Sequence, residues 1–235
     1  MTSVKPVRPA RLAVVSAGLS EPSSTRLLAD RLTEATRVAL ADRDTEAGAT
    51  GADEATGADG VEVEVVELRD VAREIANAFV TGLTGDELRR GVGKVTEADG
   101  LIAVTPVFSA SYSGLFKSFF DVVGMTDNDA LTGKPTLLGA TGGSPRHSLV
   151  LEHAMRPLFT YLRAVTVPTA VYAATDDWAA PDDGLTPSLP RRVARAGGEL
   201  AGLVAPRADT RAAPSDSLEV LPFEQQLSAL RVERP

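Results

Sequence analysis

The chain has 235 residues, of which 43% are hydrophobic and 24% charged, an ordinary composition for a folded protein with one core. Its formal charge of -8 argues against broad binding to nucleic acid or to an anionic membrane, because both need a basic surface that neutralises phosphates. One anionic ligand is still allowed, since backbone N–H groups bind a phosphate locally whatever the net charge. The absence of cysteine excludes disulfides, thiolate metal sites, iron–sulfur clusters and a cysteine nucleophile.

The amino end carries one short apolar run, residues 12–15, which Ser16 and Gly18 interrupt. This run is too short for the hydrophobic part of a secretion signal. No window approaches the roughly 20 apolar residues of a membrane-spanning helix. We therefore expect a cytoplasmic protein with no membrane partner.

The chain begins with the pattern of a strand, a loop and a helix. Residues 12–15 (LAVV) form a continuous apolar run typical of a strand buried on both faces of a parallel sheet. Pro22 and the hydroxyl residues 23–25 are helix-start signals, and an apolar stripe with helical spacing follows them. Residues 42–60 contain no large apolar side chain, so they cannot offset the entropy lost on ordering, and we expect a mobile insert.

Four further strands alternate with helices along the chain. Residues 61–68 alternate valine with glutamate, as in a strand near a sheet edge, and residues 100–105, 134–140 and 165–174 read as buried strands. Residues 83–98 and 148–163 are expected to be helices, the second kinked at Pro157, which removes a backbone donor at a cost of about 3 kcal/mol. Five strands in this alternation predict an α/β fold with a doubly wound parallel sheet.

The composition changes after Asp177, where the chain becomes rich in Pro, Gly, Ala and Arg. We expect one domain over residues 1–177 and a C-terminal extension over residues 178–235, with one helix at residues 191–204. A last apolar group is expected to pack on the domain or on a partner chain; it consists of Val220, Leu221, Phe223, Leu227 and Leu230.

Three loops leave the carboxyl ends of predicted strands, where open α/β sheets bind their ligands. In residues 16–25, small hydroxyl residues precede a helix, whose free N–H groups and dipole favour an anion. The alternative is that one of Ser23, Ser24 and Thr25 merely caps the helix.

The other two loops have weaker signals. Residues 105–114 offer Phe108 as a flat apolar surface, with Pro106 holding the chain extended; the alternative, which composition alone favours, is a plain strand-to-helix turn with Phe108 in the core. Residues 140–144 contain Gly142 and Gly143, which permit close backbone approach but are equally explained by a tight turn. His147 and His153 lie six residues apart, which does not place them on one helical face, so no metal site is expected.

Together these loops resemble the NAD(P)H-dependent FMN reductase family of flavodoxin-like proteins, especially reductases that supply two-component monooxygenases. The block TPVFSASYSGLFKSFFDVV (residues 105–123) is similar to the family's T-P-x-Y-x-x-x-Y-S-G-x-x-K motif, and ATGGS precedes a helix with His and Pro as in that family. The resemblance covers residues 11–174. It implies a five-stranded parallel sheet in the order 2-1-3-4-5.

The resemblance also implies a set of FMN-binding residues, and Phe108 stands where many relatives have tyrosine. The phosphate would lie at the first loop, the isoalloxazine and ribityl chain at the second, and the other flavin edge at the third. The implied residues are, in that order, Ser16, Ser23, Ser24 and Thr25; Pro106, Val107, Phe108 and Ser109; and Thr141, Gly142 and Gly143.

The activity implied by the resemblance is hydride transfer from NADPH or NADH to FMN, which needs no acid–base side chain, so we assign no catalytic residue. It further implies a homodimer or homotetramer, with contacts from the helices near Ser113 and Pro157, and a flavin-dependent monooxygenase as a candidate partner. The alternatives are a flavodoxin-like electron carrier and a quinone or azo-dye reductase. The insert and the tail have no counterpart in shorter members of the family.

Overall fold

The computed structural model describes residues 9–46, 61–179 and 187–204, and its centre is a parallel sheet. The strands pair in the order β2-β1-β3-β5, and both β6 and β7 pair with β5. The strands are β1 (Ala10–Ser16), β2 (Val61–Glu67), β3 (Gly100–Phe108), β4 (Ser111–Tyr112), β5 (Pro135–Gly142), β6 (Val165–Thr166) and β7 (Val171–Ala174). The predicted doubly wound α/β fold is confirmed, with β2 at an edge, but the sheet has seven strands instead of five.

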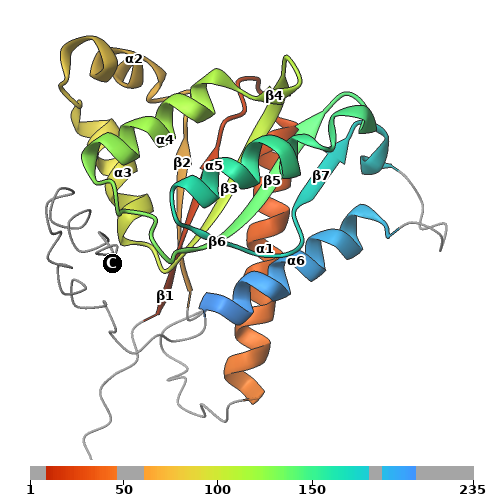
Figure 1. Cartoon of the computed structure of the whole chain (residues 1–235). Helices are drawn as coiled ribbons and strands as arrows, with labels where there is room; N and C mark the ends of the chain where they lie inside the picture. The colour runs from red at the N-terminus through yellow and green to blue at the C-terminus, as the bar shows by residue number, and fades with distance from the viewer. Residues whose placement is uncertain (1–8, 47–60, 180–186, 205–235) are drawn as a thin grey trace, which may run out of the picture.

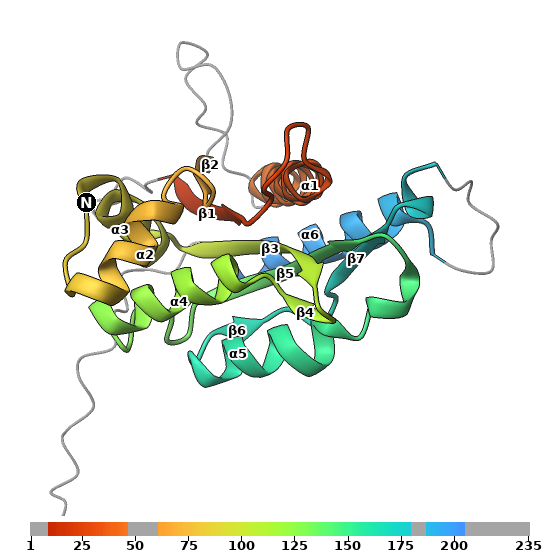
Figure 2. The same cartoon turned by 90° about the horizontal axis from the view of Figure 1, so that it is seen from above.

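Helices cover both faces of the sheet (Figure 1 and Figure 2). The first face carries α2 (Ala72–Thr81), α3 (Asp86–Glu97), α4 (Gly114–Thr126) and α5 (Arg156–Tyr161), and the second carries α1 (Ser24–Glu46) and α6 (Leu189–Val204). Three short helical turns complete the description: η1 (Pro145–His147), η2 (Leu151–Met155) and η3 (Asp176–Trp178). Among the residues described, no helix combines the length and apolarity needed to cross a membrane.

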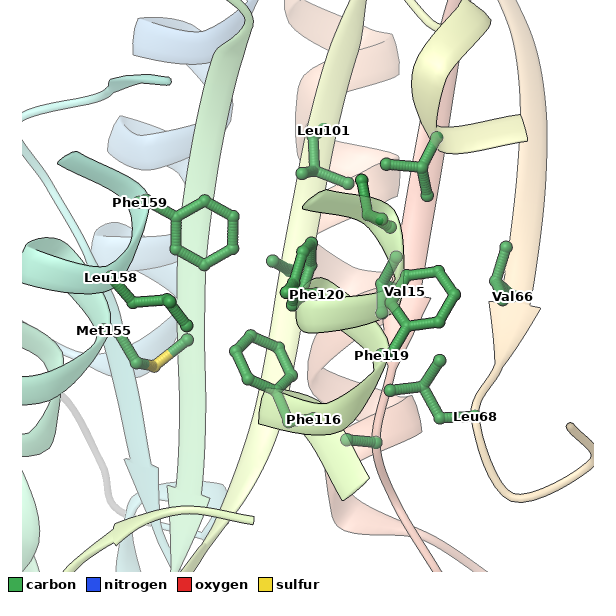
Figure 3. Packing of buried hydrophobic residues seen from close by; sticks show 14 of the residues in the cluster. Val15, Val66, Leu68, Leu101, Phe116, Phe119, Phe120, Met155, Leu158 and Phe159 are labelled. Atoms are coloured by element: carbon green, nitrogen blue, oxygen red, sulfur yellow. The ribbon is translucent and has the colours of Figure 1, made fainter. Parts of the chain in front are cut away.

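Each face has its own apolar core. On the first face, fully buried phenylalanines from α4 and α5 pack edge to face, with ring centroids 4.8 Å apart for Phe116 and Phe120 and 4.9 Å apart for Phe120 and Phe159 (Figure 3). Burial of each such ring stabilises the fold by roughly 1.5–3 kcal/mol. On the second face, α1 and α6 meet so closely that a Cβ on Gly197 would lie 2.7 Å from the backbone of Ala35. Helix α6 is therefore a close-packed part of this layer.

The extra strands arise in two places. The segment expected to be a loop after residue 105 continues as strand to Phe108 and returns as β4 in a short hairpin. The predicted strand 165–174 is divided into β6 and β7. At the division Arg156 donates to the carbonyls of Val167 and Pro168, both at 3.1 Å. The N–H of Thr169 donates to Glu199 at 2.7 Å. Side-chain hydrogen bonds therefore replace the backbone bonds between strands there.

The remaining elements match the predictions with shifted bounds. Helix α2 was not predicted, and the helix expected at residues 83–98 begins at Asp86. Helix α1 runs to Glu46, so the first five residues of the predicted insert are helical, while residues 47–60 and the apolar group at residues 220–230 lie outside the described ranges. The expected kink at Pro157 coincides with a π-helical turn, η2, which ends two residues before the proline. The wider turn accommodates a residue that has no backbone N–H to donate.

Lys134 lies at the amino end of β5 and is 9% exposed. Its ammonium group donates to the carbonyls of Thr96, at 3.1 Å, and Ala98, which satisfies carbonyls at the end of α3. Burial lowers the pKa of Lys134 to about 8 from the usual 10.5, although nearby Asp99 opposes this shift. Between these two pKa values the unfolded chain binds more protons than the folded chain, so the stability should rise with pH in that window.

We expect the free energy of unfolding of the wild type, minus that of Lys134→Met, to increase by about 2 kcal/mol between about pH 7 and pH 9.5. Urea denaturation across this range measures the difference, and the subtraction removes contributions from all other titrating groups. A difference that stays constant with pH would show that Lys134 keeps an ordinary pKa.

Candidate functional site at the carboxyl edge of the sheet

A cavity of about 340 Å³ opens at the carboxyl edge of the sheet. It is formed by the start of α1, the end of β3, the end of β5 and the segment after β7. The lining residues are Ser24; Pro106, Val107 and Phe108; Thr141, Gly142 and Gly143; and Thr175 and Trp178. The three loops singled out in the sequence therefore do meet at one site.

The first turn of α1 contributes Ser24 to the lining of this cavity. Ser23 caps the helix, because its Oγ accepts the N–H of Arg26 at 3.2 Å and its carbonyl accepts the N–H of Leu27 at 3.0 Å. The N–H groups of Ser24 and Thr25 precede the first intrahelical bond and have no helical acceptor. A Cβ on Gly18 would lie 2.0 Å from the Oγ of Ser23, so only glycine lets the loop approach the cap this closely.

Two hydroxyl residues lie beneath this turn. Thr25 Oγ1 and Thr141 Oγ1 are buried and 2.8 Å apart, a hydrogen bond that ties the start of α1 to the end of β5. Only one of the two hydroxyl hydrogens is used in that bond, so the other is free to reach a ligand. Ser16 Oγ is also buried and is unpartnered within the described part of the chain. An orphaned hydroxyl is costly unless a ligand or a water satisfies it.

The second loop is a strained hairpin. Ser113 donates its backbone N–H to Thr105 Oγ1 at 3.0 Å and also caps α4, which fixes the base of the hairpin. Phe108 is 46% exposed at the cavity, so the alternative that buries it in the core is wrong. Ser109 and Ala110 form the two-residue turn with φ values of 48° and 65°. Ser109 lies at the exposed tip and is not among the cavity-lining residues.

The third loop is supported from below by Tyr172. Its hydroxyl donates to the carbonyl of Ser144 at 2.8 Å. A Cβ on Gly142 would lie 2.2 Å from the hydroxyl oxygen of Tyr172. A Cβ on Gly143 would meet nothing within 4 Å, so the backbone there is open to a ligand. Burial, and secondly the charge of Asp177, raise the pKa of Tyr172 above its usual value.

Two lining residues, Thr175 and Trp178, were missed in the sequence. They follow β7, the last strand that ends at this edge, so the rule that located the other loops also applies to them. Trp178 is the only tryptophan of the chain, and the guanidinium of Arg31 lies 4.9 Å from its ring centroid.

The cation in the first turn of α1, Arg26, is already neutralised. Arg26 pairs with Glu67 and with Asp30, the latter at 2.7 Å, and these bonds hold the pKa of Arg26 above its usual value. An anion at this end would therefore depend on N–H groups and hydroxyls more than on a free charge. Within the described ranges, no cluster of three His, Asp or Glu side chains could hold a metal ion.

These features define a flavodoxin-like α/β protein with a ligand cavity at the strand ends. A sequence profile described as NADPH-dependent FMN reductase matches residues 10–179, and the chain belongs to this family. It is 37% identical over 172 residues to the NADH-dependent FMN reductase SfnF of Pseudomonas fluorescens (strain Pf0-1), covering 73% of this chain and 80% of that protein. The NADH-dependent FMN reductase SfnE of Pseudomonas putida is 40% identical over 119 residues, 51% of this chain and 62% of that protein.

Solved structures agree with this assignment. An oxidoreductase of Corynebacterium diphtheriae superposes with a TM-score of 0.74 and 43% identity, covering 86% of this chain and 100% of that one. A WrbA-like flavodoxin of Agrobacterium tumefaciens superposes with a TM-score of 0.52 at 14% identity over 83% of this chain and 97% of that one, which shows the shared flavodoxin-like fold alone.

Replacing Ser109 by Asn together with Ala110 by Gly should stabilise the protein by about 1 kcal/mol, because Asn-Gly accepts two positive φ values with less strain. Chemical denaturation measures the change. Ser111→Asn, one position further along in β4, is the matched control and should give no gain. A double variant no more stable than the wild type would show that the turn stores no strain.

Proposed function

We propose that this protein transfers a hydride from NADPH or NADH to FMN bound in the cavity at the strand ends, and either releases reduced flavin or passes electrons to an acceptor. The observation that carries the proposal is that the N-terminus of α1 and the exposed ring of Phe108 lie at the same cavity. A flavin mononucleotide has the matching chemistry, an anionic phosphate at one end and a flat ring system at the other.

The residues present fit this ligand. The free N–H groups of Ser24 and Thr25, with the unpartnered hydroxyl of Ser16, would hold the phosphate. Phe108 would lie against the ring system, and the open backbone at Gly143 leaves room for its edge. When bound, FMN supplies the hydride-accepting ring, so no side chain has to act as acid or base.

The chain's own contribution is therefore positioning and electrostatics. The walls from β3 and β5 orient the ring and exclude water from one side of it. Backbone N–H groups at Gly142 and Gly143 would stabilise negative charge that develops on the reduced ring. The buried hydroxyl pair of Thr25 and Thr141 keeps the phosphate end and the ring end at a fixed separation.

The activity is tested by mixing the purified protein with FMN and NADPH or NADH and following loss of the nicotinamide absorbance. Free FMN, quinones, an azo dye and a partner oxygenase are compared as acceptors. We expect oxidation with FMN as acceptor or cofactor. Flavin binding without nicotinamide oxidation by any acceptor would favour the electron carrier and contradict the reductase.

Ser24→Ala should weaken FMN affinity about tenfold, because it removes the Ser24 hydroxyl, which lines the cavity beside the free N–H groups and would donate a further hydrogen bond to the charged phosphate. Riboflavin, which lacks the phosphate, should bind the variant and the wild type equally. Ser20→Ala is the control in the same loop, since the hydroxyl of Ser20 already donates to the carbonyl of Pro22 at 3.0 Å. Equal losses for FMN and riboflavin would contradict a phosphate site at Ser24.

We also propose that the protein is a homodimer or homotetramer in the cytoplasm and that a flavin-dependent monooxygenase can receive its reduced flavin. Large exposed apolar side chains on and beside α4 and α5, namely Met125, Leu149 and Tyr161, support an interface on that face. Light scattering after size exclusion tests this, with Leu149→Asp expected to shift the wild-type oligomer toward smaller species. A monomeric wild type would contradict the assembly.

A further inference from the structure

Helix α6 lies beyond residues 10–179, the part of the chain that the family profile matches, yet it reaches the wall of the cavity through Arg192. Arg192 Nη2 and Asp177 Oδ1 are 2.7 Å apart, and Arg192 Nε donates to the carbonyl of Pro187 at 3.2 Å. The two side chains of the ion pair are only 25% and 28% exposed. Solvent screens such a pair less than a pair on the open surface.

Asp177 connects this cation to the end of the sheet. Its second carboxylate oxygen, Oδ2, accepts the backbone N–H of Ala174, the last residue of β7, at 2.7 Å. Both oxygens of Asp177 are therefore used, one toward β7 and one toward α6. The short turn η3, which contains Asp177 and Trp178, is held on both sides as a result.

Trp178, the last residue of η3, lines the cavity. Arg31 on α1 lies over the indole at 4.9 Å from the ring centroid, a cation–π contact with the ring. Arg31 does not line the cavity, whereas Trp178 does. Trp178 and Phe108 thus supply the two aromatic side chains of the cavity, one from the segment after β7 and one from the end of β3.

The same guanidinium also supports the glycine loop. Arg192 Nη1 donates to the carbonyl of Tyr172, and the Tyr172 hydroxyl holds the carbonyl of Ser144 beside Gly142 and Gly143. Arg192 is thus bonded to the residues that fix two of the four segments around the cavity.

We propose that Trp178 forms an aromatic wall against the flavin ring and that Arg192, acting through Asp177, is a positioning residue for that wall. This proposal rests on the proposed function, because it takes FMN as the ligand. It gives the C-terminal extension a role: α6 sets how tightly the ring end of the flavin is held, while the phosphate end depends on α1.

Because Trp178 is the only tryptophan, its fluorescence reports this wall alone. We expect FMN to quench the emission of the wild type, and Arg192→Gln to weaken FMN and riboflavin binding alike by about tenfold while making the indole more accessible to acrylamide. Arg195→Gln, an exposed position one turn further along α6, is the matched control and should change neither property.

Further variants separate positioning from a loss of folding. Arg192→Lys keeps the charge and should recover part of the affinity. Asp177→Asn combined with Arg192→Gln should lose less than the sum of the two single effects, since each single variant already breaks the contact that the two residues share. Trp178→Phe should bind more tightly than Trp178→Ala. Thermal unfolding of each variant is measured in parallel.

Unchanged flavin affinity in Arg192→Gln, or an equal loss in Arg195→Gln, would overturn the proposal. So would wild-type FMN binding without any quenching of Trp178. These outcomes differ from failure of the proposed function, in which the wild type itself binds no FMN and oxidises no nicotinamide.

Discussion

The site depends on the register of the parallel sheet. Ser16 of β1 lies opposite Val104 of β3, Pro106 of β3 lies opposite Thr141 of β5, and Gly142 lies opposite Ala174 of β7. Because these strands run in parallel, their carboxyl ends all lie toward the same edge of the sheet, and the four segments that follow them share that edge. A one-residue slip in any pair would turn the lining side chains to the opposite face.

An acidic protein can hold an anion at the start of α1 even though the cation of that turn is already paired. The net charge of -8 opposes an anionic ligand at long range, and Arg26, the cation in the first turn of α1, is paired with two carboxylates. The attraction that remains is local: unsatisfied N–H groups, buried hydroxyls and the positive end of a long helix. Such groups are oriented by the fold, so they favour a ligand of the right shape over anions in general.

The sequence predicted which loops meet at this edge of the sheet where local rules apply, and it failed where contacts between distant residues decide the structure. Apolar runs located the buried strands, and the loops after them followed from chain direction alone. The hairpin at residues 108–111 was missed because Ser109 and Ala110 adopt positive φ without the glycine or asparagine that usually signals such a turn. The division between β6 and β7 was missed because Arg156 and Glu199, remote in sequence, satisfy the backbone there. Arg192 gave no signal, since nothing in its own helix indicates Asp177 as its partner.

The two aromatic walls are held in unequal ways, and this bears on how a flavin would enter and leave. Trp178 is fixed by contacts to α1, β7 and α6, through Arg31, the N–H of Ala174 bonded to Asp177, and Arg192. Phe108 stands at the tip of a two-residue ladder closed by a strained turn, beyond the contacts that hold the base of the hairpin, namely Thr105 with Ser113 and Tyr112 with Phe116. Local opening costs least where few contacts must break, so the hairpin is the wall that can yield. A firm wall on η3 and a yielding one on β3 suit the proposed function, in which the ring must be oriented for hydride transfer.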